Sequence, residues 1–174
     1  MTLQEFIQTK GVAVAASKGA HLFRQGEEDK SLYYVSTGLI KAYYLSPKGQ
    51  ETIKSFISSG NVIASLLSIF NDEPCSFNVF CLEDCELIKI PSEELIALTN
   101  SDQEMAREMQ HLLRQLAMKK ERREYELLCL SAEERYRRFR HESPELLTRV
   151  TQNDIARYLG VTPVGLSRIK KRLG

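Results

Sequence analysis

The sequence contains no apolar run long enough to cross a membrane, and its N-terminus does not show the basic-then-apolar pattern of a secretory signal. These features favour a cytoplasmic protein without a membrane partner. The chain has 174 residues, of which 43% are hydrophobic, so it is long enough for one medium domain and a small one.

Reactive side chains are few and scattered. The four cysteines include no Cys-x-x-Cys pair, which argues against a metal or iron–sulfur site and favours buried thiols. The three histidines, His21, His111 and His141, lie far apart, with no nucleophile elbow or phosphate loop near them. We therefore expect a protein that is not an enzyme, with no catalytic residue and no metal.

The C-terminal segment carries the most informative pattern in the chain. Thr151 can cap a first short helix, and Gly160 supplies a left-handed residue to end it. Thr162 can cap a second helix, with Pro163 at its first position. The apolar positions that point one way are Ile155, Leu159, Val161, Leu166 and Ile169. This spacing predicts a helix-turn-helix, whose second helix enters the DNA major groove.

The charge distribution agrees with binding to double-stranded DNA. Residues 1–100 hold 8 basic and 12 acidic side chains, whereas residues 101–174 hold 16 and 11, so the two segments carry −4 and +5. A concentrated basic surface attracts phosphates. A solvated helix face would have a similar charge, so the charge supports the motif without replacing it.

The rest of the chain divides into strands and then helices. Residues 18–90 show short runs rich in β-branched and aromatic residues, separated by glycines, which predict a sandwich or barrel. A long helix is expected over residues 101–130. Its apolar seam consists of Met105, Met109, Leu112 and Leu116. The seam could pack on its own barrel, but we favour pairing with a second chain in a homodimer.

A capping box begins at Ser131 and marks a hinge after the long helix. The predicted domains are an effector barrel (1–100), a dimerisation helix (101–130) and a helix-turn-helix domain (131–174). The expected fold class is α+β.

This order of elements resembles the Crp/Fnr family of bacterial transcription regulators over roughly residues 15 to 173. The residues that carry the resemblance are segments 19–26, 32–38, 60–62 and 83–87. The resemblance implies a barrel of the cyclic-nucleotide-binding jelly-roll type and a terminal winged helix-turn-helix. Because the sequence ends at Gly174, directly after the second helix, we expect the wing to be absent. The implied function is sequence-specific transcription regulation by a homodimer. The alternative is a small-molecule sensor or protein-interaction module whose DNA-binding domain has lapsed.

The resemblance also indicates where a ligand pocket would lie. Family members that bind cyclic AMP carry Phe-Gly-Glu after a glycine turn and an Arg-Ser or Arg-Thr pair further along. The equivalent residues here are Ile63, Ala64 and Ser65, followed by Cys75 and Ser76, of which only Ser76 matches. Without the carboxylate and the guanidinium, we expect no cyclic AMP binding at physiological affinity and no cofactor. The pocket either takes an unidentified small-molecule effector or is a filled vestige.

The second helix of the motif should contact DNA. The resemblance aligns Arg168 with a base-contacting arginine, which could pair with guanine, and Val164 could touch a thymine methyl. We expect phosphate or flanking contacts from the other polar side chains. The predicted DNA-binding residues are Thr162, Pro163, Val164, Ser167, Arg168, Lys170 and Lys171.

Overall fold

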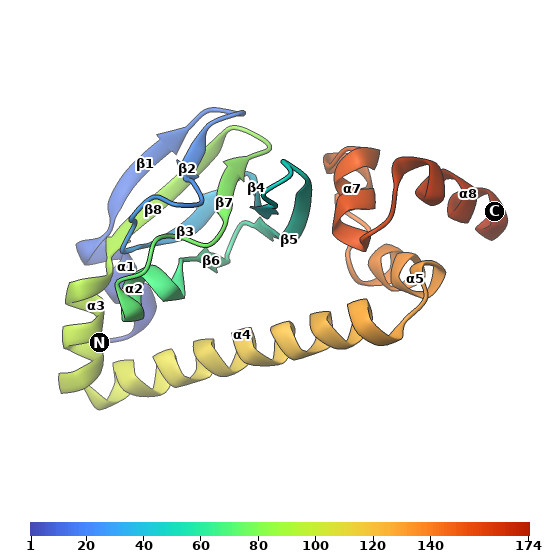
Figure 1. Ribbon diagram of the computed structural model, residues 1–174. Helices are drawn as coiled ribbons and strands as arrows, with labels where there is room; N and C mark the ends of the chain where they lie inside the picture. Colours follow the sequence, from blue (N-terminus) through green and yellow to red (C-terminus); the bar gives the residue numbers. More distant parts are fainter.

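The computed structural model describes residues 1–174 and shows a β-barrel, a long helix and a group of short C-terminal helices (Figure 1). The strands are β1 (Val12–Ala16), β2 (His21–Phe23), β3 (Ser31–Thr37), β4 (Leu39–Leu45), β5 (Glu51–Ser58), β6 (Val62–Ile63), β7 (Asn78–Cys81) and β8 (Cys85–Pro91). The helices are α1 (Leu3–Lys10), α2 (Leu66–Asn71), α3 (Ser92–Ser101), α4 (Gln103–Cys129), α5 (Ala132–Glu142), α6 (Leu146–Arg149), α7 (Gln152–Leu159) and α8 (Pro163–Leu173). The predicted α+β fold is confirmed.

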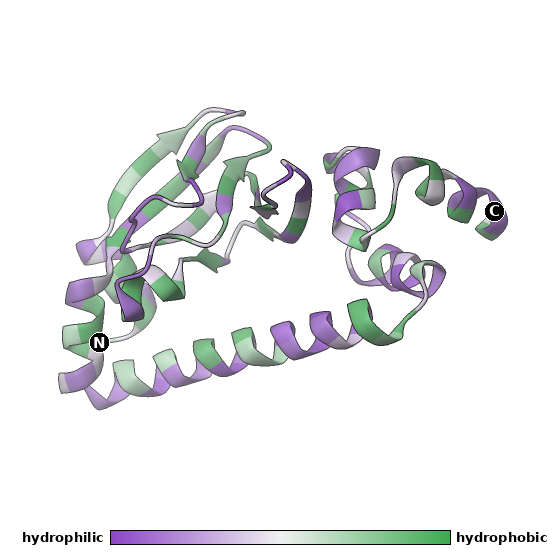
Figure 2. Ribbon diagram, viewed as in Figure 1, coloured by the Kyte–Doolittle hydropathy of each residue, from purple (hydrophilic) through white to green (hydrophobic).

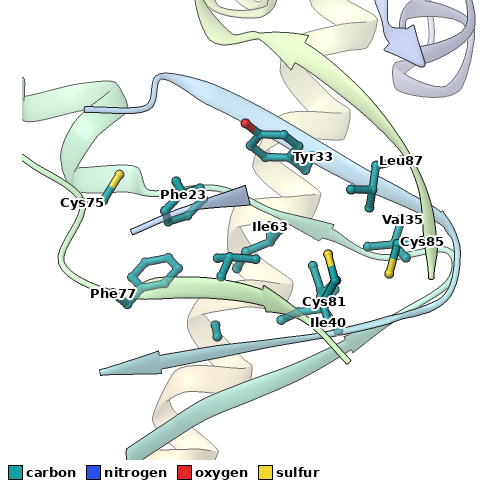
Figure 3. Close-up of a cluster of buried hydrophobic side chains, with 13 residues drawn as sticks. Phe23, Tyr33, Val35, Ile40, Ile63, Cys75, Phe77, Cys81, Cys85 and Leu87 are labelled. Atoms are coloured by element: carbon teal, nitrogen blue, oxygen red, sulfur yellow. The ribbon is translucent and has the colours of Figure 1, made fainter. Parts of the chain in front are cut away.

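The barrel is built from two four-stranded antiparallel sheets, with strand orders β1-β8-β3-β6 and β2-β7-β4-β5. Alternate residues of both sheets point inward, so Val35, Ile40 and Val79 are completely buried between them. Figure 3 shows aromatic, aliphatic and cysteine side chains from the two sheets meeting in this core.

Three of the four cysteines lie in or beside the barrel core, as expected from the sequence. Cys75, Cys81 and Cys85 are buried free thiols, and Cys129 is exposed. Burial, together with neighbouring Cys85, raises the pKa of the Cys81 thiol to about 12. That thiol therefore stays protonated at neutral pH and behaves as a small apolar side chain.

The junction between β3 and β4 depends on glycine. Gly38 has φ +99°, and a Cβ at this position would lie 2.6 Å from the Cys85 sulfur and 2.7 Å from the Asp84 carbonyl oxygen. Any side chain would therefore meet both backbone strain and a collision. This tight junction allows the chain to pass directly from one sheet to the other.

A second core lies where the first and third helices and the start of α4 cover the barrel. It contains Phe6 and Ile7 of α1, Leu95 of α3 and Met105 of α4. Met105 has 0% exposure, so its predicted place in a seam between two chains is wrong. The first turn of α4 is instead held by its own chain.

Beyond that turn, α4 runs along one side of the barrel (Figure 1). Its 27 residues correspond to a length of about 40 Å. Asp102 caps its N-terminus by accepting the Met105 N–H at 3.0 Å. Figure 2 shows hydrophilic and hydrophobic residues in alternation along its length, as on an amphipathic helix.

The four C-terminal helices share a third core with the barrel. Ser131 and Glu134 form the predicted capping box, so α5 begins where the hinge was expected. The helices bury ten residues, including Leu39 from the start of β4. Because Leu39 belongs to the barrel, the C-terminal helices are packed against it rather than suspended from α4.

Candidate functional site

The turn between α7 and α8 has the local chemistry that the sequence predicts. Thr151 accepts a hydrogen bond from the Asp154 N–H at 3.1 Å, and Thr162 accepts one from the Gly165 N–H at 3.1 Å. Gly160 ends α7 in the left-handed region, at φ 69°. Both caps satisfy amide groups that would otherwise have no partner at a helix N-terminus.

One side of this helix pair is fully buried. Ile155 and Ala156 of α7 have 0% exposure, and Leu166 and Ile169 of α8 have 1% and 4%. The small side chain of Ala156 leaves room for close packing between the elements. The apolar register predicted for the helix-turn-helix is therefore confirmed.

The opposite side of α8 is open to solvent. The seven predicted DNA-contacting residues, Thr162, Pro163, Val164, Ser167, Arg168, Lys170 and Lys171, are all exposed. Val164, Ser167, Arg168 and Lys171 follow the i, i+3, i+4, i+7 spacing of a single helix face. The structure thus brings four of the seven onto one stripe, with the other three at its start and side.

The basic side chains on this stripe have no acidic partners. Neither Arg168 nor Lys171 takes part in any ion pair of the chain, whereas Arg172 lies 3.7 Å from Glu133. Lys170 donates to the Gln152 side chain at 2.9 Å, a neutral partner that leaves its charge uncompensated. The exposed stripe of α8 is therefore a cationic surface suited to phosphates.

A buried charge network joins α7 to the barrel, and sequence reasoning missed it. Lys41 of β4 is 7% exposed, and its ammonium donates to Glu51 at 2.6 Å and to Asp154 at 2.9 Å. Arg157 also reaches Glu51, at 3.0 Å. The sequence does show one indication of it, a single lysine within an otherwise apolar strand. A lysine buried there needs an acidic partner, because an isolated charge is costly to bury.

Other contacts secure the same docking surface. Arg149 and Glu83 form a bidentate ion pair, in which Nε donates to Oε1 at 2.9 Å and Nη2 donates to Oε2 at 2.6 Å. This contact holds the pKa of the Glu83 carboxyl below its usual value. The Tyr158 ring lies 5.4 Å from Phe56 of the barrel, and the Arg123 guanidinium stacks 3.9 Å from the same ring. Barrel, long helix and helix-turn-helix therefore meet around Tyr158.

The groove between the barrel and α4 has a volume of about 1880 Å³. Among its lining residues are Met109, Leu112 and Leu116, the members of the predicted seam that follow Met105. These three side chains are partly exposed within the single chain. Met109 still packs against the core that contains Met105, whereas Leu112 and Leu116 belong to none of the buried clusters of the chain.

Four of the five predicted pocket residues also line this groove: Ile63, Ala64, Ser65 and Ser76. The fifth, Cys75, does not, because it is 1% exposed and packs among the side chains of the barrel core (Figure 3). The prediction that Cys75 faces a ligand is therefore wrong. The Ser65 hydroxyl is buried and has no hydrogen-bond partner.

No group of three or more histidine, cysteine, aspartate or glutamate side chains is placed to hold a metal ion. No helix combines the length and apolar character needed to cross a membrane.

A family model described as a cyclic nucleotide-binding domain matches residues 13–102. The chain is similar to the fumarate and nitrate reduction regulatory protein of Vibrio cholerae serotype O1, with 31% identity over 169 residues. The protein of the same name from Escherichia coli K12 is 30% identical over 166 residues. In both comparisons the match covers 89% of this chain and 66% of the relative, so the chain spans just under two thirds of their length.

Among solved structures, FixK2 from Bradyrhizobium japonicum superposes with a TM-score of 0.82 at 20% identity. The superposition covers 94% of this chain and 84% of that one. At this level of identity, the likeness supports the fold alone.

Proposed function

Because the chain belongs to the Crp/Fnr family of transcription regulators, we propose that it is a sequence-specific DNA-binding regulator that acts as a homodimer. The observation that carries this proposal is the exposed stripe on α8, where Arg168 and Lys171 stand free of acidic partners. The buried face of the same helix fixes the orientation of that stripe.

The residues of the stripe have different roles in this proposal. Arg168 reads a base, because a guanidinium can donate two hydrogen bonds to guanine O6 and N7. Val164, which is 62% exposed, contacts a thymine methyl. Thr162, Ser167, Lys170 and Lys171 position the helix through phosphates. Pro163 starts the helix and sets the angle at which it enters the groove.

The dimer is formed through α4 in this proposal. Met109, Leu112 and Leu116 leave apolar surface unfilled along the groove, and a second copy of α4 has the matching seam. Two recognition helices related by a two-fold axis would occupy successive major grooves, about 34–36 Å apart. The DNA site should accordingly be a pseudo-palindrome.

The remaining assignments follow from this function. The barrel (1–100) is an effector domain, residues 101–130 form the dimerisation helix, and residues 131–174 form the DNA-binding domain. Cyclic AMP is not its effector, since neither Ser65 nor Cys75 can replace the family's carboxylate and guanidinium. We assign no catalytic role and a cytoplasmic location, in keeping with relatives named as regulatory proteins.

The experiment that tests this function is recovery of bound fragments from sheared genomic DNA at physiological salt, followed by sequencing. The proposal predicts enrichment of a two-fold symmetric motif. The Arg168→Ala variant should lose the motif, whereas Lys10→Ala, at the exposed end of α1 far along the chain from α8, should retain it. No enrichment by the wild-type chain would contradict ligand-independent DNA binding and favour a lapsed DNA-binding domain.

A further inference from the structure

The first turn of α8 presents an apolar surface with little capacity for hydrogen bonds. It begins with Pro163, Val164 and Gly165. Pro163 has no N–H, and the Gly165 N–H already donates to the Thr162 hydroxyl at 3.1 Å. The isopropyl group of Val164 extends into solvent and is 62% exposed. Residues 163–165 therefore form an apolar tip at the start of the helix.

Gly165 keeps a further side chain out of this apolar tip. A Cβ at this position would lie 3.2 Å from the Thr162 hydroxyl oxygen and 3.8 Å from the Val161 Cβ. Any larger residue would therefore crowd the hydroxyl that caps the helix. The glycine thus preserves the cap and leaves Val164 without a neighbouring side chain at the next position.

In the major groove, the apolar tip would meet the edges of base pairs, because the N-terminal residues of a recognition helix contact these edges. A donor or acceptor of a base that loses water against Val164 gains no partner, which is costly. The C5 methyl group of thymine is the apolar group that unmodified DNA presents in the major groove. Val164 therefore favours a base that carries this methyl group.

The same methyl group occurs on 5-methylcytosine, at the same position of the pyrimidine ring. Unmodified cytosine lacks it and presents its N4 amino group as a donor, for which Val164 has no acceptor. Methylation of cytosine thus creates the contact that thymine provides, although the paired base is guanine rather than adenine. Val164 can therefore distinguish methylated from unmethylated cytosine.

Arg168 adds a guanine to this recognition. It lies one turn after Val164 on the same exposed stripe and takes part in no ion pair. Four residues of an α-helix rise by about 6 Å, which is less than two base-pair steps of about 3.4 Å each. A methyl group at Val164 and a guanine at Arg168 would therefore lie within two base pairs of each other.

We propose that α8 binds DNA that carries a 5-methylpyrimidine within two base pairs of a guanine, and that it accepts 5-methylcytosine, unlike cytosine, in place of thymine. Val164 is the residue that determines this specificity, so DNA binding by the chain responds to cytosine methylation. Because it concerns the helix that binds DNA, this specificity rests on the proposed function.

Fluorescence anisotropy of labelled duplexes tests the specificity with the full chain. A duplex that the chain selects from a randomised library is resynthesised with each thymine replaced in turn by uracil, which removes the methyl group alone. At one thymine of each half-site, uracil should weaken binding about fourfold, the factor that corresponds to burial of one methyl group. At that position, 5-methylcytosine should bind more tightly than cytosine by about the same factor.

Variants connect the methyl dependence to Val164. Val164→Ala should bring both ratios close to one, because the shortened side chain no longer reaches the methyl group. Lys171→Ala is the matched control on the same stripe, and it should weaken binding to every duplex while leaving both ratios unchanged. Because Val164 is exposed, Val164→Ala should unfold thermally at the same temperature as the wild type.

The possible outcomes separate this specificity from the proposed function. Selection of no duplex from the library would contradict DNA binding and, with it, the specificity. Affinity for a selected duplex that uracil leaves unchanged at every thymine would overturn the specificity alone, as would equal affinity for cytosine and 5-methylcytosine. Ratios that persist in Val164→Ala would also overturn it, because another residue would then contact the methyl group.

Discussion

Lys41 illustrates how a single side chain ties the DNA-binding helices to the barrel. Its strand is otherwise apolar, so its ammonium would be costly to bury alone. Glu51 from the same sheet and Asp154 from α7 both accept hydrogen bonds from it. Asp154 also receives the Thr151 hydroxyl at 2.9 Å, so the network that docks α7 includes the cap that starts it.

Replacing Lys41 should therefore destabilise the folded chain. Lys41→Met leaves Asp154 and Glu51 partly buried without their main counter-charge, and breaking a buried pair costs about 3–5 kcal/mol. Urea unfolding at fixed chain concentration measures the change in the free energy of unfolding. The matched control is Lys48→Met, in the exposed turn after β4. A loss below about 0.5 kcal/mol, which is typical of surface positions, would contradict the buried network.

Arg168 and Lys171 should differ in what they contribute to DNA binding. Arg168→Ala should cost about 1–3 kcal/mol and relax the preference at one base position, because it removes a base contact. Lys171→Ala should weaken binding to every duplex alike, because it removes a phosphate contact. Affinity measured across singly substituted duplexes separates the two patterns. Equal losses on all duplexes for both variants would mean that Arg168 reads no base.

The long helix α4 has two parts with different partners. Its first turn belongs to the chain's own core through Met105, and its middle presents Met109, Leu112 and Leu116 to the groove. The heptad pattern places Met105 and Leu112 at equivalent positions of one seam, but Met105 is fully buried and Leu112 is partly exposed. Substitutions at the two positions should therefore affect different quantities, folding stability at Met105 and dimer affinity at Leu112.

Met105→Ala should lower the free energy of unfolding by about 2–5 kcal/mol, as expected for a buried methionine. Leu112→Glu should instead weaken the dimer at least about tenfold with little effect on the fold, because the new charge would be buried only on association. Sedimentation equilibrium and urea unfolding measure the two quantities. Unchanged association in Leu112→Glu would exclude this stretch of α4 from a dimer interface.

Across the whole molecule, local signals predicted the elements better than the contacts between them. The caps at Thr151, Thr162 and Ser131 depend on neighbouring residues, so the sequence was sufficient to locate them. The pair between Lys41 and Asp154 spans 113 positions, and no local pattern connects its members. Helix α1 was also missed, because eight residues give a weak periodic signal.

For the candidate sites as well, the sequence predicted local features but not contacts between distant segments. The seven predicted positions at α8 are all exposed, because helix periodicity already separates buried from open faces. Cys75 was misplaced because an aligned position does not fix the direction of a side chain. The groove between the barrel and α4 requires β5 and α4 to be adjacent, which only the folded chain reveals.

The proposed regulator combines a barrel, a dimer helix and a DNA-reading surface, so duplex binding as a function of salt is the deciding experiment. With a motif recovered from genomic DNA, affinity should fall steeply as salt rises, with two chains bound per duplex. Lys171→Ala should reduce the slope of log affinity against log salt by about 1. The absence of salt-dependent binding to any duplex, even at low salt, would contradict DNA regulation by this chain.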